Sequence, residues 1–246
     1  RISDAGFIPA IWVAPFIAEE GSRLFSEHSD WFVRDESGRP LHSDTVSFGG
    51  WRRGPWYMLD GSHPDAREYL RQVFSVMRRE WGCRYFKLDA NMWGALPFGV
   101  RYDPGATSVE AYRRGMEAIL EGAGEDSFIL GCNAPMWPSL GLVHGMRVTG
   151  DIQRSWPAIR SVTRESFARS WQHRRLWIND PDCVMLENQN SELSDHEILF
   201  RASAVLASGG LVLGSDRVAD MGETAMSRIL RLLPPTDSAA RFDDLS

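Results

Sequence analysis

Two short hydrophobic segments of this sequence end in a carboxylate that could act on a bound substrate. In the first, CRYFKLDAN at 83–91, side chains two residues apart share one face of a strand, so Lys87 and Asp89 point the same way. The ammonium group of Lys87 would favour the ionised form of Asp89, and an ionised carboxylate suits a nucleophile. A purely structural ion pair between these two residues is the alternative interpretation.

The second segment, GMRVTGD at 145–151, has the same pattern. In a straight strand Arg147, Thr149 and Asp151 share a face, and the carboxylate again comes last. A simple turn is the alternative, because Gly-Asp commonly marks one. We expect two carboxylates that end parallel strands to converge on one pocket. Most glycoside hydrolases need such a pair, one on each side of the bond that is cleaved.

Two further segments carry polar side chains at expected strand ends. GCNAPMWP, at 131–138, contains Cys132 and Trp137, for which a core cysteine and a loop tryptophan are the simpler interpretation. WINDPDC, at 177–183, contains Asp180 and Asp182, which suit either an Asx-turn or a hard cation. The six histidines are scattered and predict no zinc site. The sequence has no phosphate-binding, dinucleotide-binding or serine-hydrolase motif.

Short apolar runs that alternate with segments of helical period must position these side chains. Strands alternating with helices predict an α/β fold with a mainly parallel sheet. The expected strands lie at 7–16, 84–89, 127–133, 146–151, 176–179 and 210–214.

The helices between these strands have recognisable start and stop signals. Ser62 is the expected N-cap of a helix whose apolar stripe extends to Trp81. Two capping boxes, at 107–110 and 194–197, start further helices, and Gly122 and Gly124 are the expected stops of the first of these. The helix that starts at the 194–197 capping box has Leu199, Ala202, Val205 and Leu206 on one face. A last helix is expected at 221–233. The long insertion at 34–60 is predicted to be either a surface loop or a wall of the active site.

Composition excludes several classes of protein. Hydrophobic residues make up 43% of the 246 residues and charged residues 24%, which is typical of a globular protein and not of a disordered one. The net charge of −6, without a basic run, argues against nucleic acid as a partner. No apolar stretch is long enough to span a membrane. The sequence has three cysteines and no C-x-x-C motif, which predicts no disulfide framework. We expect a cytoplasmic rather than a secreted protein.

Taken in order, four motifs resemble the catalytic barrel of retaining α-galactosidases, in particular glycoside hydrolase family 36 and its clan relatives. The motifs are IWVAPF, KLDAN, GCNAPMWPSLGLVHGMRVTGD and WINDPDC. The resemblance extends from Phe7 to about Leu233. It implies a (β/α)8 TIM barrel and hydrolysis of terminal α-D-galactosyl residues of oligosaccharides by double displacement, without a cofactor or a metal. Homo-oligomers are compatible with it.

The resemblance also implies roles for individual residues. Asp89 corresponds to the catalytic nucleophile and Asp151 to the general acid/base. The positions that bind the sugar or support the site are Lys87, Arg147, Cys132, Trp12 and Asp182.

Counted against this family, the chain supplies strands three to eight, and the first two strands and the flanking β domains are absent. We therefore expect residues 1–246 to form a partial barrel, and an inactive fragment is one of the expected outcomes. Relatives that act on α-N-acetylgalactosaminides or transfer galactosyl groups are alternatives of the same kind. Alternatives of another class are a metal-dependent barrel with Mg²⁺ on Asp89, Asp151 and Asp180, and a sugar-binding fragment without catalytic activity.

Overall fold

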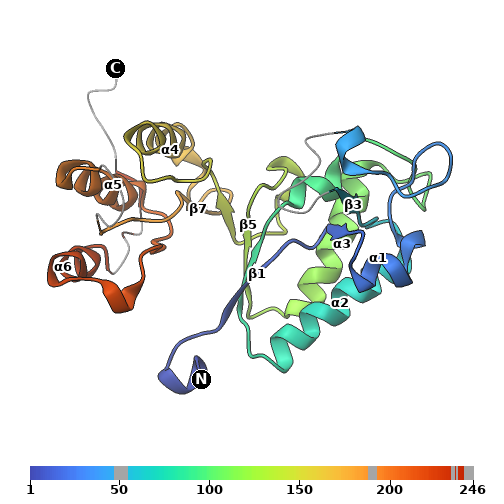
Figure 1. Ribbon diagram of the computed structural model, residues 1–246, viewed down its shortest axis with the longest axis horizontal. Coiled ribbons are helices and arrows are strands. Elements are labelled where there is room, and N and C mark those ends of the chain that lie inside the picture. Colours follow the sequence, from blue (N-terminus) through green and yellow to red (C-terminus); the bar gives the residue numbers. More distant parts are fainter. Residues whose placement is uncertain (47–54, 188–192, 234–235, 237, 241–246) are drawn as a thin grey trace. The chain divides into compact units, whose positions relative to one another are not determined.

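The computed structural model describes residues 1–46, 55–187, 193–233, 236 and 238–240. These residues form two compact units, Arg1–His144 and Gly145–Ser246 (Figure 1). In both units parallel strands alternate with helices, so the predicted α/β fold is confirmed. No helix in the described ranges is long and apolar enough to cross a membrane.

The first unit is built on three parallel strands, with β4 between β1 and β5. Trp12 of β1 lies opposite Lys87 of β4, and Leu88 of β4 lies opposite Gly131 of β5. This register brings the carboxyl ends of the three strands to one edge of the sheet. The elements of this unit are β1 (Ala10–Val13), β2 (Ile17–Glu19), α1 (Arg23–Glu27), β3 (Trp56–Met58), α2 (Pro64–Arg79), β4 (Tyr85–Leu88), α3 (Ser108–Ala123) and β5 (Phe128–Gly131).

Helix α2 starts one residue later than the sequence predicts. His63 is its N-cap and accepts a hydrogen bond from the Asp65 N–H, whereas the hydroxyl of Ser62 accepts one from the Asp103 N–H. The apolar stripe is buried over Ala66, Leu70, Phe74 and Met77. The expected end of the stripe is wrong, because the helix stops at Arg79 and Trp81 is exposed.

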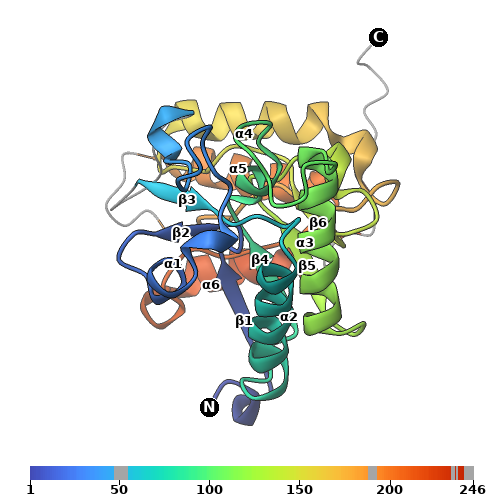
Figure 2. The ribbon, with the colours of Figure 1, turned by 90° about the vertical axis from the view of Figure 1, so that its right-hand side faces the viewer.

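Helix α3 lies beside α2 and has the predicted capping box between Thr107 and Glu110 (Figure 2). Gly124 is its C-cap, as expected, but Gly122 lies inside the helix. The reason is packing against α2. A Cβ atom at position 122 would lie 2.2 Å from the carbonyl oxygen of Arg71, so only glycine permits this approach of the two helices.

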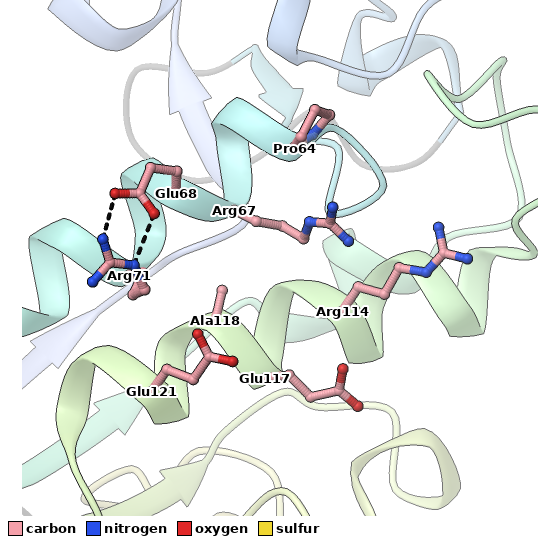
Figure 3. A pocket seen from close by; sticks show the side chains of 8 residues that line it. All are labelled: Pro64, Arg67, Glu68, Arg71, Arg114, Glu117, Ala118 and Glu121. Atoms are coloured by element: carbon pink, nitrogen blue, oxygen red, sulfur yellow. Dashed lines mark hydrogen bonds and ion pairs between the residues drawn. The ribbon is translucent and has the colours of Figure 1, made fainter.

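A groove of about 320 Å³ lies between the exposed faces of α2 and α3 (Figure 3). Its lining mixes arginine and glutamate side chains, and no strand end contributes to it. Two of the arginines are already paired, Arg71 with Glu68 and Arg114 with Asp103. The groove is therefore a surface of balanced charge and not part of the candidate site.

The core of the first unit contains a tyrosine that is expected to make stability fall at alkaline pH. Burial raises the pKa of Tyr112 to about 12, and its hydroxyl pairs with that of Ser139 at 2.8 Å. The folded protein keeps this proton above pH 10, where the unfolded chain releases it. Stability is therefore lost as pH rises from about 10 to 12, by roughly 2–3 kcal/mol.

Urea unfolding of the protein and of Tyr112→Phe at pH 9 and pH 11.5 measures this loss. We expect a clearly smaller decrease in the free energy of unfolding for the phenylalanine variant. Equal decreases in the two proteins would show that other groups cause the alkaline loss.

The insertion at 34–60 is only partly a loop. Its last part forms β3, which pairs antiparallel with β2, with Ile17 opposite Met58. Trp56, Tyr57 and Met58 are all buried. The expectation of a surface loop is therefore wrong for this part, and residues 47–54 lie outside the described residues.

The second unit is built on the parallel pair β6 and β7, with Arg147 opposite Asp180. The predicted capping box between Ser194 and Glu197 starts α5. The last predicted helix is confirmed over a shorter range, as α6. The elements of this unit are β6 (Gly145–Arg147), α4 (Trp156–Ala168), β7 (Ile178–Asp180), α5 (Asp195–Ser208) and α6 (Glu223–Arg231).

Two expectations about this unit are wrong. The segment at 210–214 is not a strand, and makes a single parallel bridge between Val184 and Gly214. The physical reason lies between β7 and that bridge, where Pro181 has no N–H and Asp182 has a positive φ of 72°, so the ladder is interrupted. On α5, Leu199 is exposed. The buried residues of that helix are Ile198, Arg201, Ala202, Ala204, Val205 and Ser208.

Candidate active site

The end of β4 presents Asp89 as predicted. Side chains alternate along the strand, with Phe86 and Leu88 buried and Tyr85 and Lys87 half-buried. Lys87 and Asp89 therefore share a face, and Phe86 and Leu88 anchor the strand in the core. This arrangement fixes the direction in which the Asp89 carboxylate leaves the sheet.

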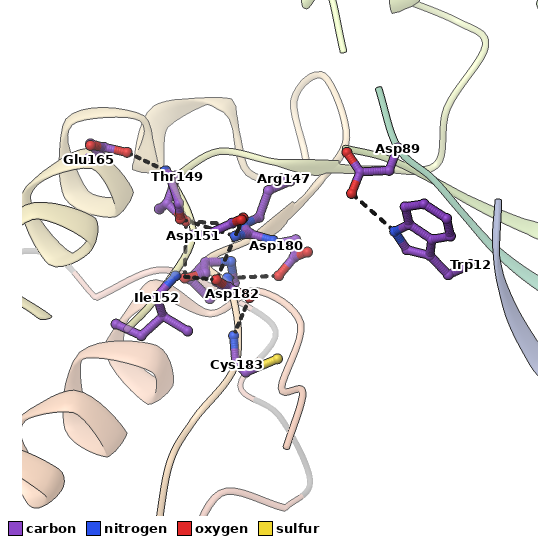
Figure 4. A network of polar contacts seen from close by, with 12 residues as sticks. Trp12, Asp89, Arg147, Thr149, Asp151, Ile152, Glu165, Asp180, Asp182 and Cys183 are labelled. Atoms are coloured by element: carbon purple, nitrogen blue, oxygen red, sulfur yellow. Dashed lines mark hydrogen bonds and ion pairs between the residues drawn. The ribbon is translucent and has the colours of Figure 1, made fainter. Parts of the chain in front are cut away.

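The carboxylate of Asp89 is held by two hydrogen bonds, one on each oxygen, and Figure 4 shows the one from Trp12. The indole N–H of Trp12 donates to Oδ2 at 3.0 Å, and the backbone N–H of Ala90 donates to Oδ1 at 2.7 Å. The described contacts of Asp89 include no ion pair with Lys87, so the expected role of this lysine is not seen. The cause is the strand register. Trp12 stands opposite Lys87, and its long side chain reaches along β4 to the carboxylate.

Backbone strain marks the carboxyl ends of three parallel strands. Ala90, Asn133 and Asp182 have positive φ angles of 53°, 45° and 72°. Each lies two residues beyond the last residue of its strand, which is Leu88 in β4, Gly131 in β5 and Asp180 in β7. Such strain in residues other than glycine is typical of functional sites, and in (β/α)8 barrels the active site lies at these strand ends.

Cys132 follows β5 at the same edge of the first unit. Its backbone N–H donates to the carbonyl oxygen of Leu88 at 2.7 Å, and its side chain is buried. Next to it, Asn133 accepts a hydrogen bond from the N–H of Met92 at 2.8 Å, which ties the loop after β5 to the loop after β4. Trp137, in the same loop, is exposed. The structure thus brings Trp12, Lys87, Asp89 and Cys132 to one edge of this unit.

In the second unit a buried arginine joins two carboxylates (Figure 4). The guanidinium of Arg147 lies 2.7 Å from Oδ1 of Asp151 and 2.5 Å from Oδ2 of Asp182. The side chain of Asp182 is 7% exposed, whereas that of Asp151 is 90% exposed. The strand ends at Arg147, not at Asp151 as predicted, because Asp151 belongs to a loop.

Asp182 does more than stabilise its own turn. The expected Asx-turn is present, because Oδ1 of Asp180 accepts the N–H of Asp182 at 2.8 Å. The carboxylate of Asp182 accepts the N–H of Cys183 on Oδ1 and that of Ile152 on Oδ2. It therefore links β7 to the loop that contains Asp151.

Sequence reasoning missed Arg201 of α5, which is 1% exposed. Its guanidinium donates hydrogen bonds to the carbonyl oxygens of Pro181, Asp182 and Cys183, and burial lowers its pKa to about 10. These contacts hold the turn after β7 in its strained conformation. An arginine that directly follows the apolar residues Ile198, Leu199 and Phe200 in a predicted amphipathic helix is the signal that could have revealed it.

Within the described ranges, no group of three or more histidine, cysteine, aspartate or glutamate side chains could hold a metal ion.

The comparisons with known proteins agree with this arrangement of strands. The α-galactosidase TtGalA from Thermus thermophilus, solved in complex with stachyose, has a TM-score of 0.80 and 29% identity, and the match covers 94% of this chain and 50% of TtGalA. The chain has a galactosidase-like α/β fold that is consistent with part of a barrel. The α-galactosidase AgaA from Geobacillus stearothermophilus shares this fold at 14% identity, with a TM-score of 0.66 over 94% of this chain and 31% of AgaA.

One curated relative is also similar in sequence. The myogenesis-regulating glycosidase of Mus musculus is 33% identical over 99 residues, which are 39% of this chain and 13% of the mouse protein. No family model matches the chain. The chain thus spans about half the length of TtGalA and about an eighth of the mouse protein, and its fold is consistent with a partial (β/α)8 barrel.

Proposed function

We propose that this chain is the catalytic barrel portion of a retaining glycoside hydrolase of the family 36 type that releases terminal α-D-galactosyl residues from oligosaccharides. Asp89 is the nucleophile and Asp151 the general acid/base. The observation that carries the proposal is the Asp89 carboxylate, which is fixed through both oxygens at the end of a parallel strand. The similarity to TtGalA over 94% of the chain supports the choice of an α-galactoside as substrate.

In this mechanism Asp89 attacks the anomeric carbon while Asp151 protonates the departing glycosidic oxygen. A covalent galactosyl enzyme forms and the leaving alcohol departs. Asp151 then removes a proton from water, which attacks the anomeric carbon and releases Asp89. A nucleophile must be held in place with little freedom, whereas an acid/base must exchange protons with solvent. The half-buried position of Asp89 and the 90% exposure of the Asp151 side chain suit these two tasks.

The remaining residues would bind the sugar or support the site. Trp12 orients Asp89 through its indole N–H, and as a residue that is 47% exposed it offers a side chain that a sugar could contact. Lys87 would bind hydroxyl groups of the sugar, and Cys132, in the loop after β5 at the same strand edge, would line the sugar pocket. In the second unit Arg147 would orient Asp151, and Asp182 would hold Arg147.

Hydrolysis by the full-length protein tests this function. We expect nitrophenol release from nitrophenyl α-galactoside with a kcat/KM at least about 100-fold above that for the 2-N-acetylated analogue, because a site fitted to one substituent rejects another. A chelator should leave the rate unchanged. Preference for the N-acetylated substrate, galactosyl transfer without hydrolysis, loss of activity on chelation, or galactose binding without turnover would each contradict the proposal.

A further inference from the structure

The loop that carries Asp151, residues 148–153, is held mainly through its backbone. The Asp151 side chain is 90% exposed, and its contact in the structure is with Arg147 at 2.7 Å. Arg147 also donates to the carbonyl oxygen of Gly150 at 3.1 Å. Arg147 orients the carboxylate, but one contact does not by itself fix the position of an exposed side chain, so the groups that hold the backbone on either side of Asp151 also determine where it lies.

Both N–H groups that flank Asp151 are bound by carboxylates (Figure 4). The N–H of Gly150 donates to Oε2 of Glu165 at 2.6 Å, and the N–H of Ile152 donates to Oδ2 of Asp182 at 2.6 Å. The two carboxylates come from different elements, Glu165 from α4 and Asp182 from the turn after β7. Hydrogen bonds to ionised acceptors are the stronger kind, and these two hold the backbone one residue before and one residue after Asp151.

Helix α4 contacts the loop with a second side chain. Arg169, one turn after Glu165 and at the C-cap of α4, donates to the carbonyl oxygen of Val148 at 2.7 Å. Glu165 thus binds the N–H of residue 150 and Arg169 binds the C=O of residue 148, which are the groups that a neighbouring strand would pair with. Ser161 donates to Oε1 of Glu165 at 3.3 Å and restrains the carboxylate further.

We propose that Glu165 is a positioning residue for the general acid/base, because it anchors the Gly150 N–H so that the Asp151 carboxyl group is held where the leaving oxygen is protonated. This inference rests on the proposed function and adds a residue that none of the sequence motifs contains. A displacement of about 1 Å in a catalytic group reduces the rate about 100-fold, so one anchoring contact has a measurable effect.

The dependence of the rate on the leaving group separates this role from a structural one. A sugar alcohol leaves only when it is protonated, whereas fluoride leaves without general-acid help. In the full-length protein, Glu165→Ala should lower kcat/KM for stachyose about 10- to 100-fold and for α-galactosyl fluoride less than about 3-fold. Glu165→Gln should recover most of the stachyose rate, because its amide oxygen still accepts the Gly150 N–H.

Glu187 provides a matched control. Its Oε1 accepts the N–H of Gly222 at 2.6 Å, the same kind of contact at the same distance but outside the loop at 148–153. Glu187→Ala should leave both rates within about 2-fold of the parent. Equal losses on both substrates for Glu165→Ala, or no rescue by Glu165→Gln, would overturn the proposal.

The parallel variant Asp151→Ala separates failure of this inference from failure of the proposed function. If Asp151→Ala loses activity on stachyose and keeps it on the fluoride while Glu165→Ala behaves like the parent, only the positioning role is wrong. If Asp151→Ala lowers kcat/KM equally for stachyose and α-galactosyl fluoride, the assignment of the acid/base is wrong, and the role inferred for Glu165 is overturned with it.

Discussion

Asp89→Asn in the full-length protein is expected to lower kcat/KM for an α-galactoside by about four orders of magnitude. The amide is not a nucleophile, so no galactosyl enzyme forms. Folding should change little, because asparagine has the same shape and its oxygen still accepts one of the hydrogen bonds from Trp12 and Ala90. Its amide group then faces the other donor, which should cost no more than about 2 kcal/mol of stability.

Nitrophenol release measures the loss, and azide identifies its cause. In Asp89→Gly the missing side chain leaves room for azide, which attacks the anomeric carbon as the aglycone leaves and yields galactosyl azide of inverted configuration. Asp126→Asn is a suitable control, because this exposed carboxylate pairs with Arg78 and Arg84 on the surface of the same unit. Near-normal turnover by Asp89→Asn would contradict the assignment of Asp89 as the nucleophile.

Arg147→Met is expected to destabilise the protein by about 3–5 kcal/mol. The arginine side chain is 3% exposed and lies 2.5 Å from Oδ2 of Asp182, whose side chain is 7% exposed. Without the guanidinium, the carboxylate of Asp182 remains buried without its charged partner. Activity should also be lost, because Asp151 loses the contact that orients its carboxyl group.

A double-mutant cycle checks the physical reason. Arg147→Met combined with Asp182→Asn removes both charges and keeps a residue that tolerates the positive φ of 72° at this position. The double variant should be less destabilised than Arg147→Met alone, whereas independent sites would give additive losses. Urea unfolding gives the free energies of unfolding. A loss below about 1 kcal/mol for Arg147→Met would mean that water or another group compensates Asp182.

Local patterns in the sequence predicted the elements that carry the site. Alternation along 85–88 placed Lys87 and Asp89 on one face, and two capping boxes marked helix starts, because these features depend on residues a few positions apart. The Asx-turn at Asp180 is of the same kind. Where such local signals competed with packing, as at Gly122, the prediction was wrong.

The partners of the candidate catalytic residues were decided by tertiary structure. Trp12 donates to Asp89 from 77 positions away, because the β1–β4 register places it there. Asp182 reaches Ile152 across 30 positions, and Glu165 reaches Gly150 from a helix that the sequence analysis did not identify. Side-chain alternation along a strand, capping boxes and Asx-turns each depend on residues a few positions apart, so the amino-acid sequence determines them directly. Contacts between distant segments exist only after strands have paired and helices have packed, so no local pattern encodes them.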